Sequence, residues 1–334
     1  PNADKFHVDG KLFNLETEGL NFSGTFKAED LLGEYIPLKL ELQSNPLPIT
    51  KVDILRTTLA NVDLAPVILE SGQIESMFID FQGLINPRHD PFKEIIVTSG
   101  FKTSDLEVSI NKNGKNERVT LPYLEGKGVW QKNTLNYEIN GVLWDGSIQS
   151  SFVINLPNAL NGSRMGTINS EIKLHGLNLA SAELSLPHQW APITGTAKGM
   201  FKLQGPIGKS SSGLRKSGQI YINDLKLGLK TPISFGSIAL YLQQKSSQQS
   251  LVRVHVKDAL LDNVFIKNAG ANIKLFPERV LLTQGHLVLP NGVIHFSGDY
   301  HPQPKTYIVR INGTDIHIED LLINRIEGTA LFKG

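Results

Sequence analysis

Apolar and polar side chains alternate with a period of two along most of this 334-residue chain. Val252, Val254 and Val256, for example, alternate with Arg253 and His255. Successive side chains of an extended strand point to opposite faces of a sheet, so this period predicts strands with one apolar and one polar face. The same pattern recurs in the segments 36–42, 225–230 and 307–312. We therefore predict that half-buried β-strands dominate the structure.

Turn signals and helix signals both favour an all-β fold. Dipeptides typical of tight hairpins separate the alternating segments at Asp9-Gly10, Asn113-Gly114, Asp145-Gly146 and Asn291-Gly292, which predicts antiparallel pairing. The segments with helical character are few and short, and they lie at residues 29–32, 180–184 and 318–322. At roughly ten to twelve residues per strand and turn, the chain would form about 25 to 30 strands, too many for one simple sandwich.

The composition excludes several classes of function. The chain has 33 basic and 32 acidic residues, so its net charge of +1 gives no general electrostatic attraction to nucleic acid or acidic membranes. It has no cysteine, which excludes disulfides, thiolate metal sites and cysteine nucleophiles. No segment approaches the ~18 apolar residues of a membrane span, and the first residues do not resemble a signal peptide. We expect the sequence to be a fragment of a longer chain.

One pattern recurs three times along the chain. Each copy has a short segment that ends in a leucine or isoleucine and a small or polar residue, followed by a glycine-bounded alternating block. The copies are residues 59–65 with 72–83, residues 174–180 with 193–205, and residues 311–317 with 326–334. Their starts, at positions 59, 174 and 311, lie 115 and 137 residues apart, which is longer than a propeller blade or a β-helix coil. The chain is therefore predicted to be an array of imperfect repeats.

The glycine-bounded blocks also carry a family resemblance. Residues 195–205 follow the form Gly-x-x-x-Gly-x-Phe-x-Leu-x-Gly, and residues 261–275 lead into a glycine-bounded hairpin. These features resemble the AsmA-like superfamily of bacterial envelope proteins, which includes AsmA, TamB and YdbH-like proteins. The resemblance implies an elongated, twisted antiparallel sheet that is curled into an open, repeating β-groove with few short helices.

The resemblance also implies a function. A β-groove of this family would bind phospholipid acyl chains and transport lipid between the inner and outer membranes, as a periplasmic protein anchored to the inner membrane in its full-length form. The alternative function is a scaffold for outer-membrane protein assembly, with an outer-membrane protein or lipoprotein as partner. We expect residues 1–208 and 218–334 to form the groove and the polar segment 209–217 to be an exposed loop between them.

The candidate lipid-binding residues are the apolar side chains of the clearest alternating strands. They are Leu225, Leu227, Val252, Val254, Val256, Ile273, Leu275, Ile294, Phe296, Val309 and Ile311. A strand of five to six residues spans ~17–20 Å, about the length of a stretched acyl chain. The same residues would form the dry core of a closed sandwich, and alternation alone does not distinguish these two structures.

Motifs that indicate chemistry are scarce. Residues 205–210 resemble a phosphate-binding loop, but the leading glycine is missing. His286 and His295 flank one predicted hairpin, and His89 precedes Asp90, yet neither pair has the spacing of a typical metal site. No nucleophile elbow or paired-carboxylate motif is present. We expect no enzymatic activity, metal or cofactor. A carbohydrate-active β-solenoid would need coils of about 20–30 residues, which the long repeat does not match.

Overall fold

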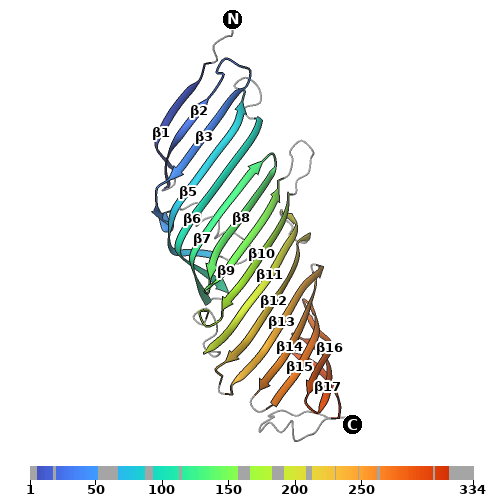
Figure 1. Cartoon of the computed structure of the whole chain (residues 1–334). Helices are drawn as coiled ribbons and strands as arrows, with labels where there is room; N and C mark the ends of the chain where they lie inside the picture. The colour runs from blue at the N-terminus through green and yellow to red at the C-terminus, as the bar shows by residue number, and fades with distance from the viewer. Residues whose placement is uncertain are drawn as a thin grey trace. The chain divides into compact units, whose positions relative to one another are not determined.

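The computed structural model describes residues 6–17, 20–51, 67–86, 93–112, 115–156, 166–182, 192–207, 213–229, 231–246, 248–261, 264–303 and 305–315. These residues form eighteen β-strands and one short 3-10 helix, η1 (Ile49–Lys51). The pairings between the strands of each unit are antiparallel, and Figure 1 shows the strands as arrows side by side in sequence order. The predicted all-β, antiparallel fold is confirmed.

The chain divides into two compact units, Pro1–Leu177 with Phe201–Leu214, and Asn178–Met200 with Arg215–Gly334. Strands of the first unit are β1 (Val8–Thr17), β2 (Leu20–Ala28), β3 (Ile36–Ser44), β4 (Leu47–Pro48), β5 (Val67–Ile85), β6 (Lys93–Lys112), β7 (Lys115–Gln131), β8 (Thr134–Leu143), β9 (Gly146–Asn155) and β10 (Gly166–Asn178). Each pairs with the next in sequence, except that β3 and β4 both pair with β5. The first unit is thus an antiparallel meander.

The second unit is a meander of the same kind. Its strands are β12 (Arg215–Leu227), β13 (Ile233–Ser246), β14 (Gln249–Leu261), β15 (Val264–Phe276), β16 (Arg279–Leu289), β17 (Gly292–His301) and β18 (Thr306–Thr314). Strand β11 (Ile193–Ile207) contributes residues to both units. The loop expected at residues 209–217 falls partly outside the described residues, and β12 begins within it at Arg215.

The strand register confirms the alternation predicted from the sequence. On β14, Val254 lies opposite Leu240 of β13 and Ala271 of β15. The next residue, Arg253, lies opposite Tyr241 and Asn272. Directly opposite residues of antiparallel strands share a face, so apolar residues gather on one side of the sheet and polar residues on the other.

Three strands continue through a kink at which the alternation changes phase. Asp105 in β6, Asp224 in β12 and Asp258 in β14 have positive φ angles of 49°, 52° and 53°. Around the second kink Asn223 and Asp224 are both exposed while Leu225 is buried, so the apolar side moves along the strand by one residue. Strands therefore grow long, up to the 20 residues of β6. For this reason the described residues form fewer strands than the 25 to 30 expected.

The glycine repeat of the sequence corresponds to these kinks. Gly72 of β5 and Gly195 of β11 are the first glycines of their repeated blocks and have φ angles of 131° and 134°. A Cβ atom on Gly195 would lie 2.9 Å from the carbonyl oxygen of Asn223 and 3.1 Å from the Cα of Leu225. A Cβ on Gly72 would lie 2.9 Å from the Cα of Leu106, next to the kink in β6. The first glycine of each block thus lets a neighbouring kinked strand approach closely. The third block lies outside the described residues.

The turn predictions have mixed outcomes. The hairpin at Asp145-Gly146 is confirmed, but Trp144 and Asp145 occupy the turn, with φ angles of 47° and 59°. The β16–β17 hairpin is confirmed as well, and Asn291 lies in its turn before Gly292 begins β17. Lys112 pairs with Lys115 around the signal at 113–114, whose own residues are outside the described part.

The turn expected at Asp9-Gly10 is wrong. Both residues lie inside β1, opposite Lys27 and Phe26 of β2. A side chain on Gly10 would overlap with the Phe26 ring, so the glycine serves close packing within the sheet and does not form a turn. The helix expected at 29–32 is also wrong, because these residues form the connection between β2 and β3. Residues 180–182 form a turn, and 318–322 lie outside the described residues.

Buried side chains form small clusters in both units. The cluster of the first unit consists of Phe22, Leu42, Leu47, Ile49, Leu69, Ile74 and Leu106. The cluster of the second unit consists of Ala259, Ile266 and Leu289, with half-buried neighbours that include Val256 and Ile294. These clusters are too small to bury the apolar side of every strand.

Because the kinked part of β12 approaches Gly195 of β11 closely, we expect that Gly195 cannot be replaced by a residue with a side chain without loss of stability. Gly195→Ala places a Cβ against backbone atoms in a φ range that L-residues rarely adopt, so we expect the free energy of unfolding to fall by about 1–3 kcal/mol. Gly298→Ala on β17 is the matched control, because its φ is ordinary and the nearest atom to its Cβ would be the Ile308 carbonyl oxygen at 3.2 Å. Urea unfolding followed by circular dichroism measures both variants. Equal effects of the two substitutions would contradict a special role for the glycine at the kink.

Candidate functional site

The eleven candidate residues all lie on one side of the second unit. Val252 is opposite Ile273, and Leu287 is opposite Ile294. Gly285 is opposite Phe296, which is opposite Ile311 of β18. Leu225 is opposite Phe235, which packs with Val256 around the cluster of Ala259 and Ile266. Sequence alternation thus placed these side chains together, although their role in lipid binding stays a prediction.

We define the apolar face of the second unit as the aliphatic and phenylalanine side chains on this side. Besides the eleven candidates, it includes Ile220, Ile222, Ile233, Phe235, Ile238, Leu240, Leu242, Ile266, Val280, Leu282 and Leu287. None of these side chains carries a hydrogen-bonding group. The apolar face therefore extends over all seven strands from β12 to β18.

Most of the apolar face is half-buried or exposed, although Leu225 and Ile266 are buried. Val254, Ile273 and Phe296 are intermediate in exposure, and Val309 and Ile311 of β18 are 56% and 60% exposed. Strands β12 to β18 are consecutive neighbours in a single sheet, and the described residues form no second sheet that could pack on this face. In a closed sandwich the facing sheet would bury these side chains. For the described residues, the structure favours an open apolar surface over a dry core.

The dimensions of the apolar face suit a long apolar ligand. Seven strands with a spacing of ~4.8 Å extend ~29 Å along the ladder, and the ten residues from Ile233 to Leu242 extend ~30 Å along β13. Contiguous exposed apolar patches of more than a few hundred Å² on a monomer mark binding grooves or interaction sites. A contiguous apolar surface this large indicates a binding site. The side chains that define the face carry no polar groups, which matches a ligand without polar atoms along its length, and Tyr300 and Tyr307 lie on the same side at its margin.

A row of aromatic rings occupies the apolar side of the first unit, and the sequence analysis missed it. The Phe101 and Tyr137 rings stack with centroids 6.3 Å apart, and those of Tyr137 and Phe152 stack at 5.4 Å. Side chains at Gly126 and Gly128 of β7 would overlap with the Phe101 and Tyr137 rings, so these rings lie flat across β7. Burial raises the pKa of the Tyr137 hydroxyl. The paired glycines inside an alternating segment were the signal that could have located this row.

The residues considered for other chemistry do not assemble into a site. His286 and His295 lie directly opposite each other, on the polar side of the second unit. The described residues contain no group of three or more His, Cys, Asp or Glu side chains that could hold a metal ion. His89 and Asp90 lie outside the described residues, as do positions 208–210 of the segment that resembles a phosphate-binding loop.

Comparisons with known proteins do not identify a function, so a proposed function has to rest on the fold and on the two faces of the sheet. No protein-family model matches the chain, and no curated protein and no solved structure is significantly similar to it. The relation to the AsmA-like superfamily therefore stays a prediction. Within the described residues, no helix has the length and apolar character needed to cross a membrane.

The half-buried state of the apolar face predicts its reactivity toward a water-soluble probe. The chain has no cysteine, so single cysteines can be introduced without a background. We expect Val254→Cys to react with a polar maleimide in the folded protein, at a rate between those of Arg253→Cys on the exposed side and Ala259→Cys, which is 1% exposed. Mass spectrometry over time measures the rates. Labelling of Val254→Cys only after addition of urea would show that another part of the protein covers the face.

Proposed function

We propose that this protein holds phospholipid acyl chains on the apolar face of the second unit and conducts lipid along it. The observation that carries the proposal is a largely half-buried apolar surface across seven consecutive strands, on which no second described sheet packs. An apolar surface of this extent in water is unfavourable unless a ligand covers it. Acyl chains offer the flexible, purely apolar cover that such a surface requires.

The energetic demand of lipid transfer supports a continuous surface. Each CH₂ group kept out of water contributes about 0.8 kcal/mol, so exposing two tails of about 16 carbons to water would cost on the order of 25 kcal/mol. A path that passes lipid must therefore keep the tails covered at every step. Val254 lies between Leu240 and Ala271, one strand spacing of ~4.8 Å to each side, so the apolar path has no polar interruption there.

The proposal needs few specific polar contacts. The headgroup of a bound lipid would stay in water at the margin of the apolar face, while its tails lie against the strands. Catalytic groups are not required, because the lipid is moved and no bond changes. This arrangement is consistent with a face that is rich in valine, isoleucine and leucine.

The biological setting of the proposal comes from the family resemblance. We infer transport of phospholipid between the inner and outer membranes of a bacterial envelope, by a periplasmic protein whose full-length form is anchored to the inner membrane. The first glycines of two repeated sequence blocks, Gly72 and Gly195, both lie beside a kink in the neighbouring strand, which supports a repeating groove. A scaffold role in outer-membrane protein assembly stays the alternative prediction.

Photo-crosslinking tests which side of the sheet meets lipid. We expect photoreactive groups at Val254, Ile273 and Phe296 to capture phospholipid in bacterial cells, because the register places all three on the apolar face. Groups at Arg253 and Lys274 lie on the opposite side and should not capture it. Mass spectrometry of the crosslinked protein identifies the adduct. Equal capture from both sides would rule out the apolar face as the lipid path.

A charge on the apolar face tests continuity. We expect Val254→Asp to remain folded, because the carboxylate can reach water from a half-buried site, whereas in a closed core it would destabilise the fold by several kcal/mol. Bound phospholipid should nevertheless fall strongly. Ala239→Asp is the matched control, since it adds the same charge next to Leu240 but on the side that faces Tyr221 and His255. Thermal melting and lipid extraction from the purified variants give both readouts. An unfolded Val254→Asp variant, or equal lipid loss in the control, contradicts the proposal.

A further inference from the structure

The near-zero net charge of the chain hides opposite charges on its two units. Of the 33 Lys and Arg residues, 18 lie in the first unit and 15 in the second; of the 32 Asp and Glu residues, 22 lie in the first and 10 in the second. The first unit thus has a net charge of −4 and the second a net charge of +5. The absence of electrostatic attraction inferred from the whole sequence does not hold for the second unit by itself.

In the first unit, several bases form ion pairs with neighbouring carboxylates. The Nζ atom of Lys27 lies 2.6 Å from a carboxylate oxygen of Glu29, and Lys39 pairs in the same way with Glu41. Lys173 and Lys202 each lie 2.8 Å from Glu171, and hydrogen bonds from these two lysines lower the pKa of Glu171 to about 2. These bases are already neutralised within the protein.

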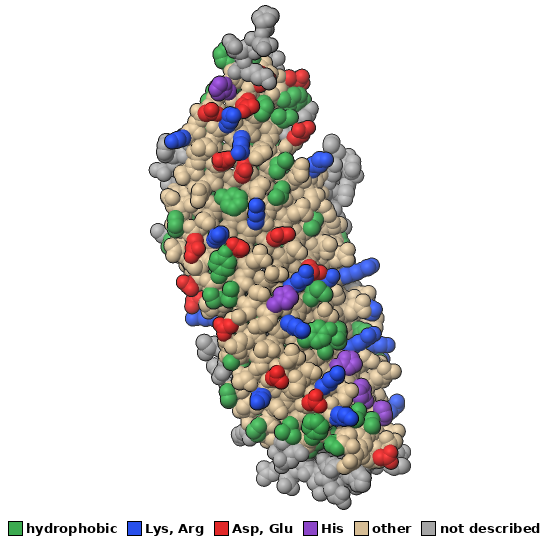
Figure 2. Space-filling view, in the orientation of Figure 1, with side chains coloured by type: hydrophobic (Ala, Val, Ile, Leu, Met, Phe, Trp, Pro, Cys, Tyr) green, Lys and Arg blue, Asp and Glu red, His purple; other side chains and the backbone are tan. Residues whose placement is uncertain are grey.

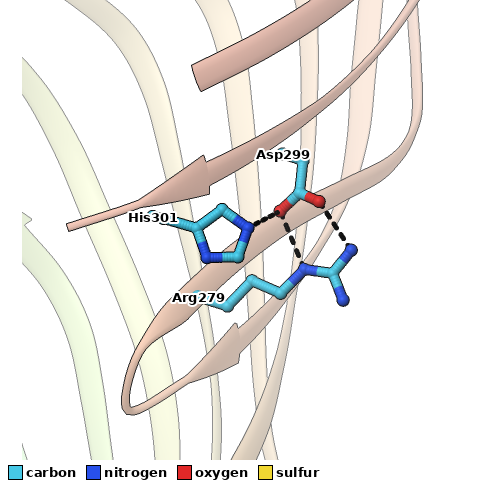
Figure 3. A network of polar contacts seen from close by, with 3 residues as sticks. All are labelled: Arg279, Asp299 and His301. Carbon is cyan, nitrogen blue, oxygen red and sulfur yellow. Dashed lines mark hydrogen bonds and ion pairs between the residues drawn. The ribbon is translucent and has the colours of Figure 1, made fainter. Parts of the chain in front are cut away.

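In the second unit, the ion pairs of the described residues involve a single carboxylate. Arg279 donates hydrogen bonds of 2.8 Å and 2.6 Å to the two oxygens of Asp299, and the Nε2 of His301 lies 3.4 Å from the first of them (Figure 3). The hydrogen bond from Arg279 is the main cause that lowers the pKa of Asp299. Asp299 is therefore already paired with Arg279 and does not neutralise the remaining bases.

Six described bases of the second unit lie on the side opposite the apolar face. We call these six residues the basic face: Lys198, Lys226, Arg253, Lys257, Lys274 and Arg310. The strand register places the last five on this side. Lys226 lies opposite Ser234, Arg310 opposite Ser297 and Lys274 opposite Leu251. Lys198 joins them because its Nζ lies 5.8 Å above the centre of the Tyr221 ring. None forms an ion pair with a described residue. Figure 2 shows basic side chains and histidines over the strands of this unit.

Aromatic and apolar side chains accompany the basic face. The hydroxyls of Tyr221 and Tyr241 are 2.8 Å apart, and their rings pack edge to face. Leu260 and Phe265 lie opposite each other at the ends of β14 and β15 and are 42% and 44% exposed. Both flank the buried Ala259 and Ile266 in sequence, so they point away from the apolar face. Bases, tyrosines and a protruding apolar pair are the residues that proteins place at a membrane interface.

We propose that the basic face docks on the surface of an anionic phospholipid bilayer. The lysines and arginines contact headgroup phosphates, the tyrosines lie at the level of the headgroups, and Leu260 and Phe265 insert between lipids. An acidic protein would satisfy the bases but would not require the protruding Leu260–Phe265 pair, so the membrane fits the observations better. Docking uses the opposite side of the sheet from acyl-chain binding and does not depend on the proposed function.

Vesicle flotation tests the docking. We expect the protein to bind vesicles of phosphatidylcholine with about one-third phosphatidylglycerol, and not pure phosphatidylcholine vesicles. Raising salt to ~1 M shortens the screening length to ~3 Å and should abolish this binding. Each basic residue near an anionic leaflet strengthens binding about fivefold, so Arg253→Glu/Lys257→Glu should weaken it at least ~25-fold. Leu260→Ser/Phe265→Ser should weaken it as well.

Matched variants distinguish docking through the basic face from a general effect of net charge. Lys127→Glu/Lys132→Glu in the first unit changes the net charge equally and should leave binding unchanged. Val254→Asp should lose bound acyl chains but still float with anionic vesicles, so docking and lipid carriage can fail separately. Equal binding to neutral vesicles, or equal loss in the Lys127/Lys132 variant, overturns the proposal. Binding to polyglutamate that requires Arg253 and Lys257, without vesicle binding, also overturns it and assigns the basic face to an acidic protein.

Discussion

The structure of each unit depends on a single antiparallel ladder of strands, which must accommodate both the backbone polar groups and the apolar side chains. Hydrogen bonds between neighbouring strands pair the backbone groups, but they do nothing for the apolar side chains that every second residue adds to one face. Most sheets solve this by packing a second layer on the apolar side. In the second unit the described residues form no second sheet on this side, and Val254, Ile273 and Phe296 are half-buried. The proposed binding of acyl chains rests on this uncovered side.

The kinks allow the ladder to be long without losing its two-sided character. A phase change at Asp224 or Asp258 moves the alternation by one residue, so the strand continues while its apolar residues still reach the same face. Gly195 opposite the first of these kinks removes the side chain that would block the closer approach. Such irregularities bend strands and increase local twist, which is how a flat sheet acquires curvature. In the first unit, the aromatic rings lie flat over Gly126 and Gly128 because these two residues have no side chains there.

The two faces of the second unit give it two separate chemistries. One face offers only dispersion and hydrophobic contact, while the other carries bases that the described residues of the unit do not neutralise internally. In the first unit, residues such as Glu171 pair with neighbouring lysines and leave less charge for a partner. A protein that handles lipid at a membrane needs both an apolar path and a means of approaching the headgroups. Opposite sides of one sheet can supply the two.

The sequence by itself determined the fold class and the side of the sheet on which Val252, Val254 and Val256 lie, because a period of two is a local property of an extended chain. It also located the repeat, since Gly72 and Gly195 mark the same structural position. Only the tertiary structure decided that Ile220 and Ile222 share a face with Leu225, because the phase change at Asp224 interrupts the alternation. The role of Gly10 as space for the Phe26 ring, and the pairing of Asp299 with Arg279, likewise depend on neighbours from other strands. Whether the apolar side is covered is the most non-local property of all: the same alternating residues fit a closed sandwich and an open sheet, and the difference lies in which strands pack against them.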